Sequence, residues 1–154
     1  MAHVTAATVD REAKQVSGSR VVRASPEQIF DLLADPARHG EIDGSGMVQR
    51  ARGEGSRLEL GSKFGMDMKM GLLPYRITNT VVEYDENRLI AWQHFGKHRW
   101  RYELEPVDGG TLVTETFDYS TAVSSKGIEL MGYPTKHCAN IDATLERLAA
   151  VVEA

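Results

Sequence analysis

Residues 98–120 read HRWRYELEPVDGGTLVTETFDYS. Apolar residues from Trp100 to Leu104 alternate with charged residues, and this period of two predicts a strand with one apolar face. Asp108-Gly109 is a strong signal for a tight hairpin turn. We therefore expect Thr111–Ser120 to pair antiparallel with His98–Pro106, because so short a connection cannot make the crossover that a parallel pair needs.

The same alternation extends toward the N-terminus and predicts most of the remaining sheet. Because the connections between consecutive segments are short, the sheet should be an antiparallel meander of about six to seven strands. The predicted strands are Lys14–Arg23, Ser62–Met70, Tyr75–Tyr84 and Arg88–Phe95, with Met47–Arg52 as a possible edge strand and Gly53–Gly61 as a glycine-rich loop.

Helix signals fall in two places, after the first strand and at the C-terminus. Ser25-Pro26 can cap and start a short helix, with Gln28 completing a capping box, and Asp35-Pro36 starts a second short helix that reaches about Gly40. After a loop over 121–132, with a possible helical turn at 126–130, Pro134 starts a helix that runs to about Glu153. Its apolar stripe is Ile141, Leu145, Leu148 and Val152, and its length of roughly 30 Å is enough to cross the sheet.

The composition is that of an ordinary globular protein. Of 154 residues, 42% are hydrophobic and 26% charged, and the length favours one domain over residues 14–154. The net charge of −4 argues against a nucleic-acid partner, which usually requires a basic surface. Residues 1–13 are small and polar, and we expect them to be a mobile lead-in to the domain.

The single cysteine, Cys138, excludes an intrachain disulfide and favours a reducing compartment, so a cytoplasmic location is expected. No apolar run is long enough to span a membrane. The glycines at 44–46 and 53–55 match no nucleotide-binding fingerprint, and no cofactor is expected.

This order of elements resembles the START/polyketide-cyclase-like superfamily (SRPBCC), in particular the group named for polyketide cyclases, dehydrases and lipid transport. The likeness covers roughly residues 14–153. It rests on the Ser25-Pro26-Glu27 helix start, the Arg88-Leu89-Ile90-Ala91-Trp92 strand, the Gly109-Gly110-Thr111 hairpin and the terminal helix. It implies an α+β helix-grip fold, in which a bent sheet wraps the C-terminal helix around an apolar cavity. Members bind lipids, sterols, polyketides or hormones, and some are enzymes; no shared catalytic motif can be transferred to this chain.

Strand alternation then selects the side chains that would face such a cavity. They are aromatic and methionine-rich with a few polar groups, which is typical of a small-molecule pocket, although the same residues could form a solid core. Met70, Tyr75, Val81 and Ile90 share these strand faces, and the predicted ligand-binding residues are Phe64, Met66, Met68, Ile77, Asn79, Trp92, His94, Trp100, Tyr102, Phe117, Tyr119, His137 and Ile141.

Glu115 is the most informative single residue. The alternation through Val113 and Phe117 turns it inward, where a carboxylate costs several kcal/mol, to order of magnitude, unless it is paired or protonated. An inward Glu115 would be a general acid or base with a raised pKa. A shift of the strand register by one residue would instead turn it to solvent.

His137 and His94 could donate to a ligand oxygen or transfer a proton near neutral pH, or they could be structural histidines. His94 and His98 flank a turn, but no third ligand is evident, so no metal site is expected.

Three classes of function fit these features. The favoured one is a carrier or sensor of an apolar small molecule, because the polar inward groups are scattered and form no set of nucleophile, base and orienting residue. The alternative is a cyclase or dehydratase with Glu115 and His137 as candidate catalytic acid and base. A weaker one is a protein-interaction module. A homodimer is possible.

Overall fold

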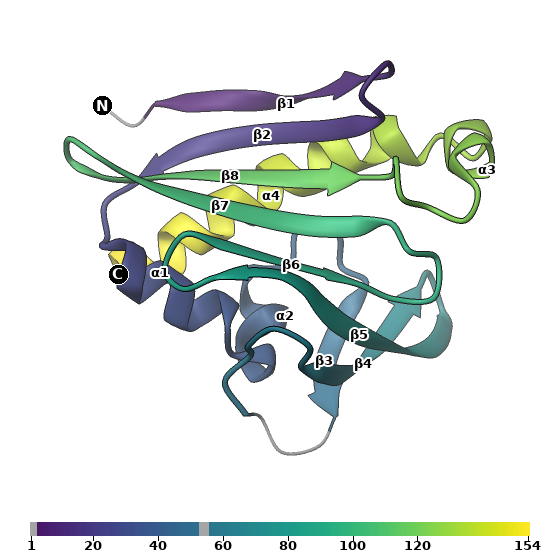
Figure 1. Ribbon diagram of the computed structural model, residues 1–154, viewed down its shortest axis with the longest axis horizontal. Coiled ribbons are helices and arrows are strands. Elements are labelled where there is room, and N and C mark those ends of the chain that lie inside the picture. Colours follow the sequence, from purple (N-terminus) through teal and green to yellow (C-terminus); the bar gives the residue numbers. More distant parts are fainter. Residues whose placement is uncertain (1–2, 53–55) are drawn as a thin grey trace.

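A computed structural model of the chain describes residues 3–52 and 56–154. Its central feature is an eight-stranded sheet in which every neighbouring pair is antiparallel (Figure 1). The spatial order is β1-β2-β8-β7-β6-β5-β4-β3. The strands are β1 (Val4–Asp10), β2 (Gln15–Val22), β3 (Val48–Arg52), β4 (Lys63–Met70), β5 (Leu73–Asp85), β6 (Leu89–Gln93), β7 (Arg99–Val107) and β8 (Gly110–Asp118).

Two short helices and a 3₁₀ turn connect β2 to β3, and two helices follow β8. They are α1 (Pro26–Leu33), η1 (Pro36–Arg38), α2 (His39–Ile42), α3 (Ser125–Leu130) and α4 (Tyr133–Glu153). The predicted capping box is present at α1, where the Ser25 side chain accepts from the Gln28 amide and the Gln28 side chain accepts from the Ser25 amide. At η1 the Asp35 side chain makes a simpler cap, because it accepts a single hydrogen bond from the Ala37 amide.

The α+β architecture predicted from the sequence is confirmed, and so is the decisive hairpin. Trp100 lies opposite Phe117 and Tyr102 opposite Glu115 across β7 and β8. Gly109, in the two-residue turn, has a φ of +87°, which favours glycine. Met47–Arg52 was predicted as an edge strand, and β3 is an edge of the sheet. Part of the predicted glycine-rich loop, residues 53–55, lies outside the described residues.

The prediction placed the first strand at residue 14 and so missed β1, which pairs with β2 at the other edge of the sheet. Its alternating residues are mostly exposed alanines and threonines, and such a strand has no apolar periodicity to detect. The mobility expected of residues 1–13 stays a prediction.

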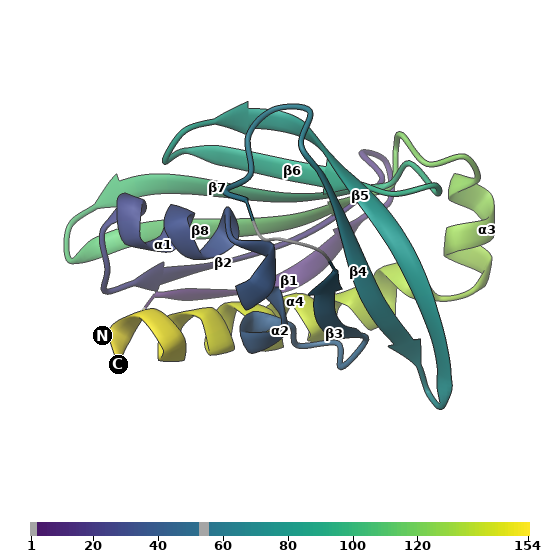
Figure 2. The same ribbon diagram turned by 90° about the horizontal axis from the view of Figure 1, so that it is seen from below.

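Helix α4 crosses the concave side of the sheet and packs against β1, β2 and β8 (Figure 2). Its stripe of Ile141, Leu145 and Leu148 is buried, together with Val16 and Val22 of β2. In Figure 2 the β4–β5 hairpin bends toward the helix side of the sheet and reaches past the level of α4, while α2 packs against the helix. The helix therefore packs against the half of the sheet that β1, β2 and β8 form.

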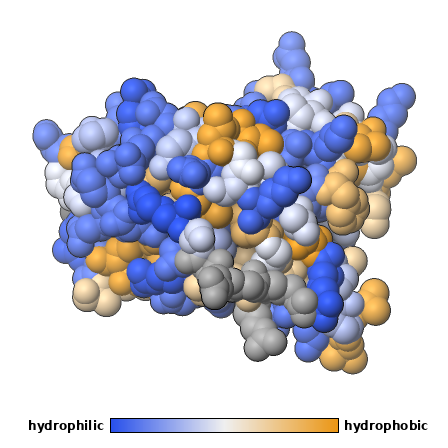
Figure 3. Space-filling model, turned by 60° about the horizontal axis from the view of Figure 1, so that its bottom comes forward, coloured by the Kyte–Doolittle hydropathy of each residue, from blue (hydrophilic) through white to orange (hydrophobic). Residues whose placement is uncertain are grey.

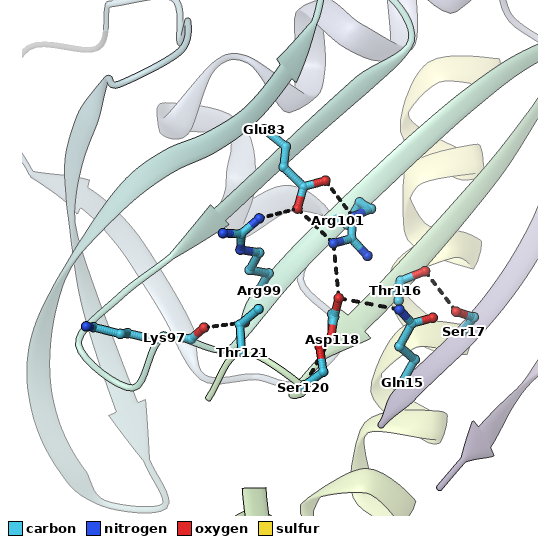
Figure 4. Close-up of polar contacts among 10 residues, drawn as sticks. All are labelled: Gln15, Ser17, Glu83, Lys97, Arg99, Arg101, Thr116, Asp118, Ser120 and Thr121. Carbon is cyan, nitrogen blue, oxygen red and sulfur yellow. Dashed lines mark hydrogen bonds and ion pairs between the residues drawn. The ribbon is translucent and has the colours of Figure 1, made fainter. Parts of the chain in front are cut away.

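The outer face of the sheet carries an ion-pair network (Figure 4). Arg101 binds Glu83 through two hydrogen bonds of 2.8 and 2.7 Å, and its guanidinium also reaches Asp118 at 3.1 Å. Arg99 binds the same Glu83 at 2.8 Å. The network joins β5, β7 and β8, and the guanidinium of Arg101, with that of Arg99, lowers the pKa of Glu83 to about 2.

We expect Glu83→Gln to destabilise the fold by about 2–3 kcal/mol at neutral pH, because two partly buried guanidinium groups lose their anion. In the parent, stability from the lowered pKa of Glu83 should be fully present above its ordinary value of 4.5 and lost as pH falls toward about 2. Urea unfolding of both proteins between these pH values measures the effect. The exposed neighbour Glu103→Gln is the control and should stay within about 0.5 kcal/mol of the parent; equal losses in both variants would contradict the network's role.

Candidate functional site

A pocket of about 420 Å³ lies in the space between the sheet, α4 and the segment that follows α2. This volume is in the usual range for small-molecule sites. Its walls come from β4 to β8 on one side and from α2, α3 and α4 on the other. The aromatic side chains of Trp92, Trp100, Tyr102 and Phe117 make much of its surface.

Most of the predicted ligand-binding residues line this pocket. They come from five neighbouring strands, the β6–β7 turn and α4: Met66, Met68, Ile77, Asn79, Trp92, His94, Trp100, Tyr102, Phe117 and His137, together with the candidate acid Glu115. Strand alternation brings them together because residues two apart share a face of the sheet. That these side chains bind a ligand stays a prediction.

Three predicted residues are buried but do not line this pocket. Phe64 packs edge-on against His39 and Trp92, behind the pocket wall. Tyr119 lies one residue beyond the end of β8, and its hydroxyl donates to Glu129. Ile141 belongs to the face of α4 that packs into the core. The helix turns His137, Asn140 and Thr144 toward the pocket instead.

Glu115 faces inward and is 2% exposed. Its Oε2 accepts a hydrogen bond of 2.9 Å from the Tyr102 hydroxyl, whose residue lies directly opposite on β7. Its Oε1 is buried and has no hydrogen-bond partner among the described residues. A buried oxygen of this kind in a pocket wall is available for a bound molecule.

Burial raises the pKa of Glu115 to about 8, because the anion loses its hydration. The Tyr102 hydrogen bond opposes this shift, and the charges of Asp43 and Asp142 reinforce it. The side chain is therefore mostly protonated at neutral pH. Since Tyr102 donates to Oε2, the carboxyl proton belongs on Oε1, where it points a donor at the pocket.

His39 is a pocket residue that sequence analysis missed. It is buried, stacks on the Trp92 ring at 4.7 Å and donates from Nε2 to the Leu33 carbonyl at 2.8 Å. Burial lowers its pKa, so the ring is neutral at pH 7. A histidine in a short helix without periodicity gives no sequence signal for this position.

Three further histidines cluster at the other end of the pocket. The ring of His98 lies 4.6 Å from that of His94 and 5.1 Å from Phe117, and the ring of His137 lies 4.4 Å from Phe117. Burial lowers the pKa of His98 and of His137 to about 4 and lowers that of His94 as well. All three are neutral imidazoles at pH 7. In the part of the chain that the structure describes, no three His, Cys, Asp or Glu side chains are grouped to hold a metal ion.

Other missed residues lie outside the predicted strands. They are Asp43, Ser45, Tyr133, Asn140 and Thr144, which loops and helix turns bring to the pocket. Asp43 does not present a free carboxylate, because it accepts hydrogen bonds from the Ser45 amide and hydroxyl and from the Val48 amide. Asn140 donates to Nδ1 of His137 at 3.1 Å, which fixes the imidazole proton on Nε2.

The pocket opens at one end of the molecule. Two of its lining residues are exposed there: Phe95, in the turn between β6 and β7, and Met70, at the end of β4. Met70 shares a strand face with Met66 and Met68. It is the last residue of β4 and is exposed, whereas Met66 is buried. The neutral acid and imidazoles thus line an apolar pocket that reaches the surface at Phe95 and Met70.

Residues 13–153 match the protein family described as polyketide cyclase / dehydrase and lipid transport. The chain belongs to this family. Membership covers nearly the whole sequence and agrees with the helix-grip fold described above. The family's description includes both enzymes and transport proteins, so the site itself must distinguish between them.

The chain is also similar to individual proteins whose names state no activity. The uncharacterized protein Rv0088 of Mycobacterium tuberculosis is 41% identical over 151 residues, which cover 95% of this chain and 67% of the relative. The crystal structure of protein Ms6760 from Mycobacterium smegmatis superimposes with a TM-score of 0.71 at 17% identity over 98% of both chains. The solution structure of an AHSA1-like protein from Aeromonas hydrophila superimposes with a TM-score of 0.60 at 18% identity, over 89% of this chain and 93% of that chain. At these identities the structural likeness shows the fold alone.

Proposed function

We propose that this protein binds one apolar small molecule in the pocket, as a carrier or sensor, and that Glu115 donates a hydrogen bond to an oxygen of that molecule. The observation that carries the proposal is the partnerless, buried Oε1 of Glu115 in the pocket wall. A buried polar group without a partner costs about 1–3 kcal/mol, and a ligand oxygen would recover that free energy.

The rest of the wall favours a neutral ligand. The four histidines that line the pocket have lowered pKa values, so none supplies a full positive charge at pH 7. An anion would enter an apolar space without a counter-ion, which costs more than any one hydrogen bond returns. The ligand class is therefore an apolar molecule with a carbonyl, ether or hydroxyl oxygen.

A second candidate function is a cyclase or dehydratase. The same proton on Glu115 favours it, because a carboxyl with a pKa of about 8 is matched to acid catalysis near neutral pH. His137, the candidate base, is poorly suited to this role, because its pKa is about 4 and its Nδ1 already accepts a hydrogen bond from Asn140. In such an enzyme Glu115→Gln should lower turnover by roughly a hundredfold or more, since an amide cannot transfer a proton.

A titration with Nile red, a neutral apolar dye that carries a carbonyl oxygen, tests the proposed hydrogen bond, and turnover of a test substrate separates the two functions. If the protein is a carrier, the Kd of Glu115→Gln for the dye should lie within about threefold of the parent's at neutral pH, because the glutamine amide nitrogen can also donate a hydrogen bond. Glu115→Leu removes the donor and should weaken binding by roughly tenfold to a hundredfold, the equivalent of 1–3 kcal/mol. Dye fluorescence and quenching of Trp92 and Trp100 report the affinity.

Circular dichroism and unfolding curves show whether both variants remain folded. Equal affinity for parent, glutamine and leucine variants would refute the hydrogen bond. Turnover of any test substrate that disappears in Glu115→Gln while its binding remains would establish the enzyme instead.

A further inference from the structure

Large apolar side chains are exposed at the end of the molecule where the pocket opens. Leu72, in the β4–β5 turn, is 91% exposed, Leu130 at the end of α3 is 88% exposed, and Phe95 is 78% exposed. The β4–β5 turn, the β6–β7 turn and α3 all lie at the right-hand end in both Figure 1 and Figure 2. The same end carries the exposed side chains of Met70, Leu73, Val123 and Met131. We call this set the apolar rim.

The rim adjoins the part of the pocket lining that reaches the surface. Met70 and Phe95 belong both to the rim and to the pocket lining, so the two surfaces are continuous. The 121–124 segment is held beside the β6–β7 turn, since the Val123 amide donates to the Gly96 carbonyl at 3.0 Å. Thr121 donates to the Lys97 carbonyl at 2.7 Å. A partner that covers the rim would therefore also contact the exposed part of the pocket lining.

Lysines gather at this end of an acidic chain, on elements that also carry Asp67 and Glu129. The net charge is −4, yet five of the six lysines lie on the elements that carry or adjoin the rim: Lys14, Lys69, Lys97, Lys126 and Lys136. Lys14 is connected to α3 by its hydrogen bond to Ser125. Several arginines elsewhere are ion-paired, as in Arg57 with Asp31 and Arg88 with Asp85. The distribution complements an anionic surface.

We propose that the apolar rim docks onto an anionic lipid bilayer, with the pocket entrance facing the membrane. Apolar side chains at turn tips can enter the boundary between headgroups and acyl chains, while lysine stems extend to the phosphates. Each lysine near an anionic surface strengthens binding by about fivefold, and one apolar contact alone would hold a protein only transiently.

The pattern favours a membrane over a second copy of the chain. Orange and blue side chains alternate at the right-hand end of Figure 3, so the apolar residues are interrupted by hydrophilic ones. A two-fold interface would bring the lysines of both copies together, and their repulsion would oppose it. No helix among the described residues is long and apolar enough to cross a membrane, and docking at the surface requires none.

Flotation of the full chain with vesicles tests this. The parent should float with vesicles of phosphatidylglycerol and phosphatidylcholine in equal parts, lose binding as salt rises, and stay behind with phosphatidylcholine alone. Lys69→Glu with Lys126→Glu should lower the partition coefficient by about tenfold or more. Lys63→Glu with Arg88→Glu changes the net charge equally, away from the rim, and should lower it by less than about threefold.

A second set of variants tests the contribution of the apolar side chains of the rim. Leu72→Ser with Leu130→Ser should weaken flotation by about tenfold, whereas Leu60→Ser, an exposed leucine outside the rim, should leave it unchanged. Nile red affinity should be equal in all of these proteins, so a failure of docking and a failure of the pocket proposal remain distinguishable. Failure of the parent to float, or equal losses in rim and control variants, would overturn the proposal. A dimer that Leu72→Ser and Leu130→Ser dissociate would assign the rim to a second copy.

Discussion

Glu115→Gln is expected to stabilise the folded protein by about 3–5 kcal/mol at about pH 9 and to change its stability little at about pH 4. In the parent, the pKa of Glu115 rises from 4.5 to about 8 on folding, so the native state retains a proton that the unfolded state releases. The stability that this retained proton contributes is therefore fully present below pH 4.5 and is lost as the pH rises through about 8. Glutamine resembles the protonated acid, keeps the Tyr102 hydrogen bond and does not titrate.

Urea unfolding of parent and variant across this pH range measures the difference directly. The charges of Asp43 and Asp142 act on Glu115, and the buried histidines titrate on the acid side. All of them are present in both proteins, so the difference between the two curves isolates Glu115. Curves that stay parallel from pH 4 to pH 9 would mean that Glu115 ionises freely and lies in contact with water.

Met68→Trp combined with Val48→Phe is expected to weaken Nile red binding by about a hundredfold. The two residues lie opposite each other on β4 and β3, and both line the pocket. Each heavy atom of a ligand of this size contributes about 0.3 kcal/mol, so displacing roughly nine atoms removes nearly 3 kcal/mol of binding free energy.

The same double variant should cost the fold only about 1–3 kcal/mol, because it fills space instead of opening a cavity. Thr78→Trp, which adds a tryptophan at an exposed position of β5, is the control and should bind the dye as the parent does. Unchanged affinity in Met68→Trp with Val48→Phe would place the dye outside the pocket.

The fold was predictable because its signals are local. The Ser25 cap, the Asp108-Gly109 turn and the period-two apolar faces each depend on a few neighbouring residues, and all appear where expected. Strand β1 was not predictable in this way: its partner is β2, but its own exposed, small side chains carry no pattern.

The part of the candidate site that the strands form was predictable from the sequence. The part that the loops and helices form was much less predictable. Alternation placed Met66, Trp100 and Glu115 on one face, and the antiparallel register then brought Tyr102 opposite Glu115. His39 and Asp43 approach from loops and short helices, whose direction depends on tertiary packing. On α4 the sequence identified the buried stripe, but the pocket face is rotated from it to Asn140 and Thr144.

Other expectations stay predictions. The single domain over residues 14–154 was predicted from length and the cytoplasmic location from the single cysteine, and a homodimer was named only as a possibility. The chain spans about two thirds of the length of the mycobacterial relative Rv0088, so the activity of that whole protein is a separate question.

Native mass spectrometry of the full chain after incubation with a bacterial lipid extract tests the central claim most directly. We expect the parent to retain one small molecule with a stoichiometry of one to one, and Met68→Trp with Val48→Phe to appear almost entirely at the mass of the free protein. A parent that stays free, or an adduct equally abundant in parent and pocket-filled variant, would contradict the assignment of this pocket as a ligand-binding site.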